Sequence, residues 1–145
     1  KKIGLIGAMD EEVAIIKEEM TNTNEVTKAG MTFVEGDFYG IKTVAVVSGI
    51  GKVNMAVCTQ ILCDDFHVTM VINTGVAGGL ADGLRVGDVV VADAVVQHDM
   101  NTTACGDPQG LLSGLNLVEL PADRALSEAL FAAAKEERAC PDGNE

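Results

Sequence analysis

The chain has 145 residues with 48% hydrophobic content and 16 glycines, which fits one α/β domain over residues 1–145 with an aliphatic core. Its formal net charge of −12 argues against nucleic acid and an anionic membrane as partners, because both are bound through lysine and arginine. The four cysteines form no CxxC pair and are not spaced with the two histidines as zinc ligands, so we expect reduced cysteines, no metal and a cytoplasmic location.

The chain is predicted to open with a strand followed by a helix. Residues 3–7 have the pattern of a buried strand, and residues 9–20 that of a helix with Val13, Ile16 and Met20 as its apolar stripe. Acidic residues crowd the first turn of this helix, where the helix dipole favours them.

A hairpin and a βαβ crossover are predicted next. Residues 31–38 and 42–48 flank a short glycine-containing link and indicate two paired strands. Residues 52–66 show helical spacing, and residues 68–73 resemble a buried strand. We therefore expect a mixed central sheet flanked by helices. The apolar positions of the second helix are Val53, Ala56, Val57, Ile61 and Leu62, with Cys58 and Cys63 as small hydrophobic residues.

The last part of the chain is less regular. Residues 86–98 suggest an extended or bent strand, and residues 99–120 form a long loop of the kind that is often functional. Pro121 is expected at the first position of a last helix. Residues 140–145 resemble a turn leading to another strand, so we expect a C-terminally truncated domain without its later strands and helices.

Three glycine-bearing turns, at residues 7–12, 48–52 and 73–79, each follow a predicted strand. In open α/β sheets, ligands bind beyond the carboxyl ends of the strands, and glycine lets the backbone approach a ligand closely. The first turn carries three consecutive acids and no arginine or lysine, so it should repel phosphate. The sequence therefore predicts one pocket, built of turns, for a neutral or cationic small molecule.

Glu12 is the sharpest catalytic candidate, because it lies in the first turn of a helix that begins at a strand's carboxyl end. Its neighbours on the helix surface are Ile15 and Ile16, so partial desolvation would raise its proton affinity and suit it to general-base work. The alternative is a solvated acid at a helix start, like Asp10 and Glu11.

The other candidates also have structural alternatives. Ile50 stands between two glycines and can lie against a flat ligand. The backbone amides of residues 75–79 can bind the edge of a heterocycle. Both segments can equally be simple tight turns. His98 and Asp99 are adjacent on an extended segment and point to opposite faces, which favours a structural role. Lys52 lacks the spacing of a P-loop and is expected on a helix surface.

Five stretches, in order, resemble the 5′-methylthioadenosine/S-adenosylhomocysteine nucleosidase family, which has the nucleoside phosphorylase-type α/β fold. Together they are far more specific than any one of them, and the resemblance spans residues 2–140. The stretches are KIGLIGAMDEEV (2–13), VSGIGKVNMA (47–56), INTGVAGGL (72–80), RVGDVVVAD (85–93) and QHDMNTTA (97–104).

The resemblance implies hydrolysis of the N-glycosidic bond of both nucleosides, with release of adenine and without metal or cofactor. Glu12 would activate the attacking water. Met9 would lie against the ribose and this water, Ile50 along the sugar and the 5′-alkylthio group, and residues 77–78 along the purine. The substrate-binding residues so implied are Ala8, Met9, Ile50, Val76, Ala77 and Gly78.

The resemblance also implies a homodimer, in which the loop at residues 99–115 closes the partner's 5′ pocket. Cys105 stands in this loop where many relatives have an aromatic residue, and Val76 stands where many have serine, so contacts to the 5′ substituent should differ. By the same resemblance, we expect the family's later half, with an aspartate that protonates the departing adenine, to be missing from these residues. Such general acid help is typically worth about 10²–10⁴-fold.

Hydrolysis is favoured over phosphorolysis, because related phosphorylases place an arginine where this first turn carries acids. Negative charge also stabilises the oxocarbenium character that develops on the sugar. Two alternatives stay open. One is a purine nucleoside phosphorylase-like enzyme or a hydrolase of another adenine nucleoside. The other is a catalytically incomplete fragment that binds a nucleoside or mediates dimerisation.

Overall fold

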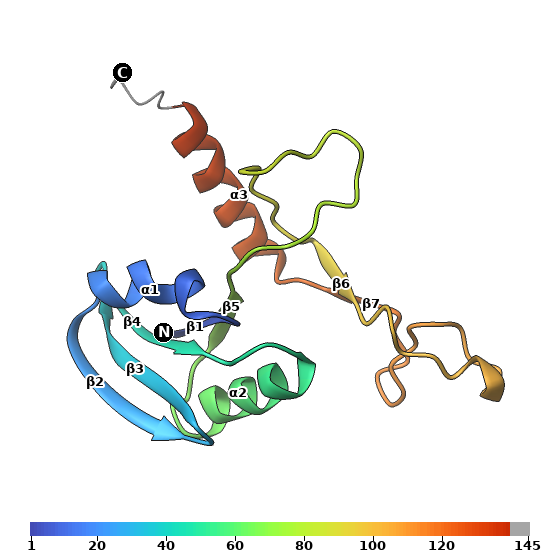
Figure 1. The fold of residues 1–145 in the computed structure, drawn as a ribbon, viewed down its shortest axis with the longest axis horizontal. Coiled ribbons are helices and arrows are strands. Elements are labelled where there is room, and N and C mark those ends of the chain that lie inside the picture. The colour runs from blue at the N-terminus through green and yellow to red at the C-terminus, as the bar shows by residue number, and fades with distance from the viewer. Residues whose placement is uncertain (140–145) are drawn as a thin grey trace. The chain divides into compact units, whose positions relative to one another are not determined.

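The structure, a computed structural model, describes residues 1–139 and divides into two compact units, Lys1–Gly79 and Leu80–Glu145 (Figure 1). Each unit is described by itself. The single domain expected over residues 1–145 stays a prediction. The turn expected at residues 140–145 lies outside the described residues, as does Cys140.

The first unit is built on a five-stranded sheet with the order β2-β3-β4-β1-β5. β1 pairs in parallel with β4 and β5, whereas β3 is antiparallel to both β2 and β4. The mixed sheet and the hairpin are therefore confirmed. β2 was not predicted, because its TNTNEVTK sequence lacks apolar alternation. The strands are β1 (Lys2–Gly7), β2 (Thr21–Lys28), β3 (Met31–Phe38), β4 (Ile41–Val47) and β5 (Met70–Asn73).

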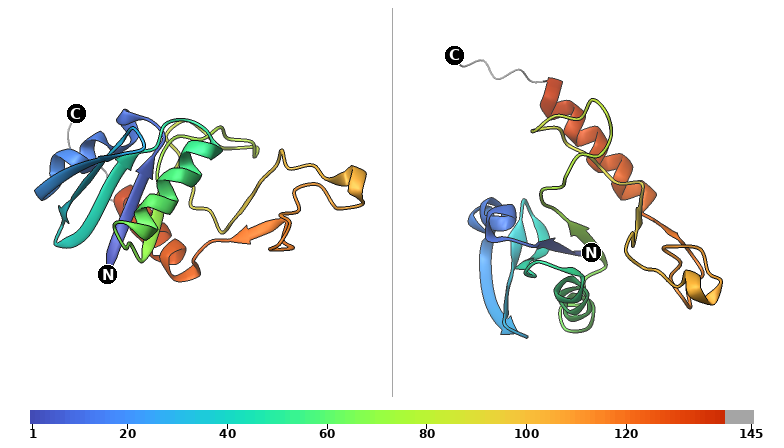
Figure 2. Two further views of the ribbon diagram at one scale, coloured as in Figure 1. Left: turned by 90° about the horizontal axis from the view of Figure 1, so that it is seen from below. Right: turned by 45° about the vertical axis from the view of Figure 1, so that its right-hand side comes forward.

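Two helices cover opposite faces of this sheet, as Figures 1 and 2 show: α1 (Asp10–Glu19) and α2 (Lys52–Asp64). On the α1 face, Met20 packs with Val34 and Ala45, with Ile16 against them, and Val13 is also fully buried. The predicted stripe of α1 is thus confirmed. The buried residues of the cluster on the α2 face are Ile6, Met31, Phe33, Val44, Val46, Cys58, Leu62 and Phe66.

The predicted apolar face of α2 is only partly right. Leu62 is fully buried, but Val53 is 79% exposed and Val57 is 43% exposed. Cys58 is buried as expected, whereas Cys63 is exposed, so its role as a packed hydrophobic residue is wrong. Apolar residues occur around much of α2, and the sheet covers only the side that carries Cys58 and Leu62.

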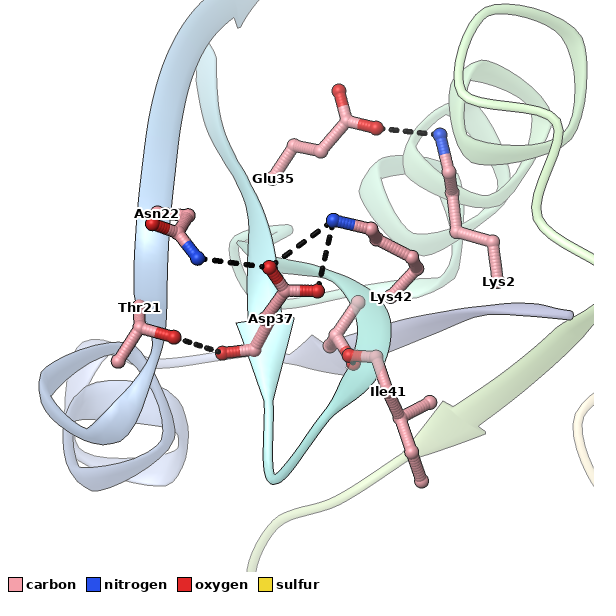
Figure 3. Close-up of polar contacts among 8 residues, drawn as sticks. Lys2, Thr21, Asn22, Glu35, Asp37, Ile41 and Lys42 are labelled. Carbon is pink, nitrogen blue, oxygen red and sulfur yellow. Dashed lines mark hydrogen bonds and ion pairs between the residues drawn. The ribbon is translucent and has the colours of Figure 1, made fainter.

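Polar side chains connect strands of the sheet. Figure 3 shows the Asp37 carboxylate of β3 contacting the Asn22 amide of β2 at 3.1 Å and the Lys42 ammonium of β4 at 2.9 Å. The hydrogen bond from Lys42, followed by that from Asn22, holds the pKa of Asp37 below its usual range. Lys2 of β1 pairs with Glu35 of β3 across the intervening β4. Ion pairs of this exposure add little stability.

The second unit contains a two-stranded antiparallel ribbon of β6 (Ala94–Val96) and β7 (Glu119–Pro121), followed by α3 (Arg124–Ala139). Between the two strands lies a long loop with one 3₁₀ turn, η1 (Thr103–Cys105), at the end of the ribbon away from α3 (Figure 1). The long loop predicted for this region is therefore largely confirmed. No helix in the described part of the chain is long and apolar enough to cross a membrane.

Two predictions for this unit are wrong. Only residues 94–96 of the expected strand at residues 86–98 are a strand, because only they find a partner, β7, among the described residues. Pro121 pairs with Ala94 at the end of β7 and does not start the helix. The Asp123 side chain instead accepts the Leu126 N–H at 2.9 Å, as an N-cap does.

Candidate active site

The carboxyl ends of three parallel strands meet at one edge of the sheet. Gly7 at the end of β1 lies opposite Val47 of β4, and Ile6 lies opposite Asn73 of β5. The turns that follow stay attached to β1, since the Ser48 N–H donates to the Gly7 carbonyl at 2.9 Å and the Thr74 N–H to the Ile6 carbonyl at 2.9 Å. The three strand ends therefore meet as predicted, whereas the pocket expected between their turns stays a prediction.

Glu12 bridges the first and third turns. Its Oε2 accepts the N–H of Ala8 at 2.6 Å and that of Met9 at 3.0 Å. Its Oε1 accepts the N–H of Val76 at 3.0 Å. Glu12 is the third residue of α1, and its carboxylate reaches back to the N–H of Met9, which precedes the helix. The half-buried side chain is therefore fixed against two backbone segments and does not extend freely into solvent.

The expectation of a raised proton affinity for Glu12 is wrong. Hydrogen bonds from the backbone N–H groups of Val76 and Met9 lower the pKa of Glu12, burial opposes them, and the N–H of Ala8 lowers it further. Hydrogen bonds donated to a carboxylate favour its charged form. The helical spacing in the sequence indicated that Glu12 lies beside an apolar face. It could not show that three backbone N–H groups donate hydrogen bonds to its carboxylate.

The Ile50 turn stands at the same edge of the sheet. The Ile50 side chain is 75% exposed, and its carbonyl accepts the side-chain amide of Asn54 at 2.9 Å. Gly49 and Gly51 have φ angles of 81° and 106°, which strain any residue with a Cβ. The contact of Asn54 with this turn was not predicted. The sequence does place Asn54 four residues after Ile50, in the first turn of a helix, and this spacing could have indicated the hydrogen bond.

The remaining candidates differ in placement. Ala8 and Met9 are half-buried beside Glu12, whereas Val76, Ala77 and Gly78 are exposed in the turn after β5, with Val76 80% exposed. This stretch contributes the Val76 N–H to Glu12 and leaves its side chains open at the edge of the sheet.

Three candidates are surface residues. Cys105 is exposed and lies in the second unit, in η1. His98, in the same unit, is exposed, and its carbonyl accepts the side-chain amide of Gln109 at 3.2 Å, in accord with a structural role. Lys52 is exposed at the start of α2, as expected for a helix-surface lysine.

Within residues 1–139, no three histidine, cysteine or carboxylate side chains form a group that could hold a metal ion.

This arrangement presents an ionised carboxylate beside a rim of small and apolar residues. A carboxylate held this way can stabilise positive charge on a bound molecule and accept a proton from water. It also disfavours phosphate, because the acidic turn carries no compensating cation.

Known proteins are similar to this chain in sequence and fold. Residues 2–141 match the family model described as Phosphorylase superfamily. The chain is 47% identical over 142 residues to the 5′-methylthioadenosine/S-adenosylhomocysteine nucleosidase of Geobacillus thermodenitrificans (strain NG80-2), covering 98% of this chain and 58% of that protein. The chain thus spans less than two thirds of the length of such curated relatives.

Solved structures agree. The nucleosidase of the same name from Neisseria meningitidis, in complex with methylthio-immucillin-A, has a TM-score of 0.91 at 39% identity, covering 94% of this chain and 59% of that one. The Colwellia psychrerythraea 34H nucleosidase in complex with adenine has a TM-score of 0.90 at 42% identity, covering 96% and 57%. These matches confirm the resemblance drawn from the five stretches. Because the family model covers residues 2–141, the chain belongs to the phosphorylase superfamily.

Proposed function

We propose that the protein hydrolyses the N-glycosidic bond of 5′-methylthioadenosine and S-adenosylhomocysteine and releases adenine. The observation that carries this proposal is the Glu12 carboxylate, bound by three backbone N–H groups where β1 and β5 end. Relatives that carry this activity in their names, two of them solved with adenine or methylthio-immucillin-A, support the substrate class.

In the proposed reaction, Glu12 activates the attacking water. The C–N bond to adenine breaks with its electron pair leaving on the base, which takes up a proton from the general acid that the family resemblance implies for the native-length protein. The sugar develops oxocarbenium character as this bond breaks. The water oxygen bonds to the anomeric carbon as its proton passes to Glu12. The lowered pKa keeps Glu12 ionised at neutral pH, so its negative charge also stabilises the cationic sugar.

The substrate contacts are proposals with partial geometric support. Met9 is assigned to the ribose and water, Ile50 to the sugar and the 5′ side, and Ala77 with Gly78 to the purine. Their position at one edge of the sheet supports this assignment. The N–H groups of Ala8 and Val76 bind Glu12, so we propose that these two residues meet the substrate through their other atoms.

We also propose that the protein is a homodimer in which the loop carrying Cys105 completes a partner's site, that it needs no cofactor and that it is cytoplasmic. The free thiols of Cys58, Cys63 and Cys105 support a reducing compartment. Because the chain spans about 58% of its relatives' length, the activity is proposed for the native-length protein, and a nucleoside-binding or dimerisation role is the alternative for these residues alone.

The experiment is an assay of adenine release from methylthioadenosine by the native-length protein, with and without added phosphate. We expect release at the same rate in both conditions. A rate that requires phosphate would establish the phosphorylase alternative instead. Calorimetric titration of the 145-residue chain with adenine and methylthioadenosine tests the other alternative, which predicts binding without turnover.

A further inference from the structure

Gly75 lies directly beneath the Glu12 carboxylate. A Cβ added at Gly75 would lie 2.4 Å from Glu12 Oε1 and 2.7 Å from its Cδ. Real Cβ atoms do not approach other heavy atoms this closely, so an alanine here forces the carboxylate or the backbone to move. Gly75 is not among the residues with positive φ, so the obstacle to alanine that the structure shows is the close contact with Glu12.

The same glycine precedes the N–H that holds Glu12. Val76 donates to Glu12 Oε1 at 3.0 Å, and Thr74, on the other side of Gly75, donates to the Ile6 carbonyl at 2.9 Å. The segment is thus attached to β1 on one side and to the carboxylate on the other. The carboxylate is the end of a flexible side chain, so we expect it to yield first, and moving it away from Gly75 weakens its bond from the Val76 N–H.

We infer that Gly75 is a positioning residue for Glu12: its missing side chain lets the carboxylate lie against the backbone and accept the Val76 N–H. The inference rests on the proposed function only where it concerns catalysis. The placement itself is a property of the fold. The hydrogen bond from Val76 is also the largest influence that lowers the pKa of Glu12.

The test is a double-mutant cycle on the native-length protein with Gly75→Ala, Glu12→Ala and both together, read by thermal unfolding. We expect Gly75→Ala to lower Tm by roughly 3–8 °C when Glu12 is present. In the Glu12→Ala background, which removes the carboxylate, we expect a change of less than about 2 °C. Gly78→Ala is the matched control for stability, because its Cβ would meet nothing within 4 Å.

A second readout is the titration of Glu12, followed by carbon-13 NMR of its carboxyl carbon. In Gly75→Ala the pKa of Glu12 should rise toward its ordinary value, whereas in Gly78→Ala it should stay where it is. Steady-state kinetics should show a loss in kcat for Gly75→Ala that exceeds any change in KM, as expected when an acting group is displaced.

Equal Tm losses in both backgrounds, or an unchanged Glu12 titration in Gly75→Ala, would overturn the inference. If Gly75→Ala does not fold but the double variant does, the inference is supported. If neither folds, it is overturned, because the cost then does not come from the carboxylate. Failure of the wild-type protein to release adenine would refute the proposed function and leave the unfolding and titration results standing.

Discussion

The Glu12 carboxylate accepts a hydrogen bond at 3.0 Å from the backbone N–H of Val76, 64 residues further along the chain. This bond joins the start of α1 to the turn after β5, two segments that are adjacent only because β1 and β5 pair in parallel. The candidate base is therefore placed by the topology of the sheet and not only by its position on a helix.

The first prediction concerns the pH dependence of stability. Because the folded pKa of Glu12 lies below the ordinary glutamate value of 4.5, its carboxylate stabilises the folded state fully above that value and progressively less as pH falls below it. The stability difference between wild type and Glu12→Gln, measured by urea unfolding, should shrink between pH 5 and pH 3. A difference that grows as the pH falls would contradict the lowered pKa.

The second prediction concerns Gly7. A Cβ there would lie 2.9 Å from both Glu12 Cβ and Val13 Cγ1, and these atoms are close to the backbone of α1 and cannot swing away. Gly7→Ala should destabilise the protein by about 1–3 kcal/mol, the usual cost of overpacking. Chemical denaturation measures this change, with Gly78→Ala as the control in open space. Equal stability of Gly7→Ala and wild type would show that α1 packs more loosely on β1.

The third prediction concerns cysteine reactivity. Burial raises the pKa of the Cys58 thiol to about 11, whereas Cys63 and Cys105 are exposed. Alkylation of the native protein at pH 8, mapped by mass spectrometry, should label the two exposed thiols and spare Cys58 until denaturant is added. Rapid labelling of Cys58 in the native state would contradict its burial.

The raised pKa of Cys58 also predicts that the free energy of unfolding falls as pH rises from 9 toward 11, because the thiol ionises at a lower pH in the unfolded chain than in the folded one.

Most of the first unit could be predicted from the sequence. Buried strands and helices with one apolar stripe leave a periodic signal, as in β1, α1 and the β3–β4 hairpin. β2 leaves none, because it is an edge strand whose first five residues are exposed. For α2, the apolar periodicity predicted the helix correctly but did not identify which of its faces packs on the sheet, because apolar residues such as Val53 also lie on the exposed face.

The second unit and the electrostatics of the site were harder to predict. The valine-rich run before β6 has the composition of a strand, but strand formation depends on a partner that the run itself does not specify. Pro121 is as compatible with the end of a strand as with the start of a helix. The lowered pKa of Glu12 depends on the N–H groups of Val76, Met9 and Ala8, which are brought together on the carboxylate only in the folded chain.

The most direct test of the central claim compares adenine release from methylthioadenosine by wild type, Glu12→Gln and Glu11→Gln of the native-length protein. Glu11 is the exposed neighbouring acid of the same helical turn and controls for the loss of one negative charge. We expect Glu12→Gln to lower kcat by about 10²–10⁴-fold, because an amide cannot accept the proton of the attacking water, and Glu11→Gln to retain turnover. Turnover by Glu12→Gln that matches the Glu11→Gln rate would contradict the assignment of Glu12 as the base.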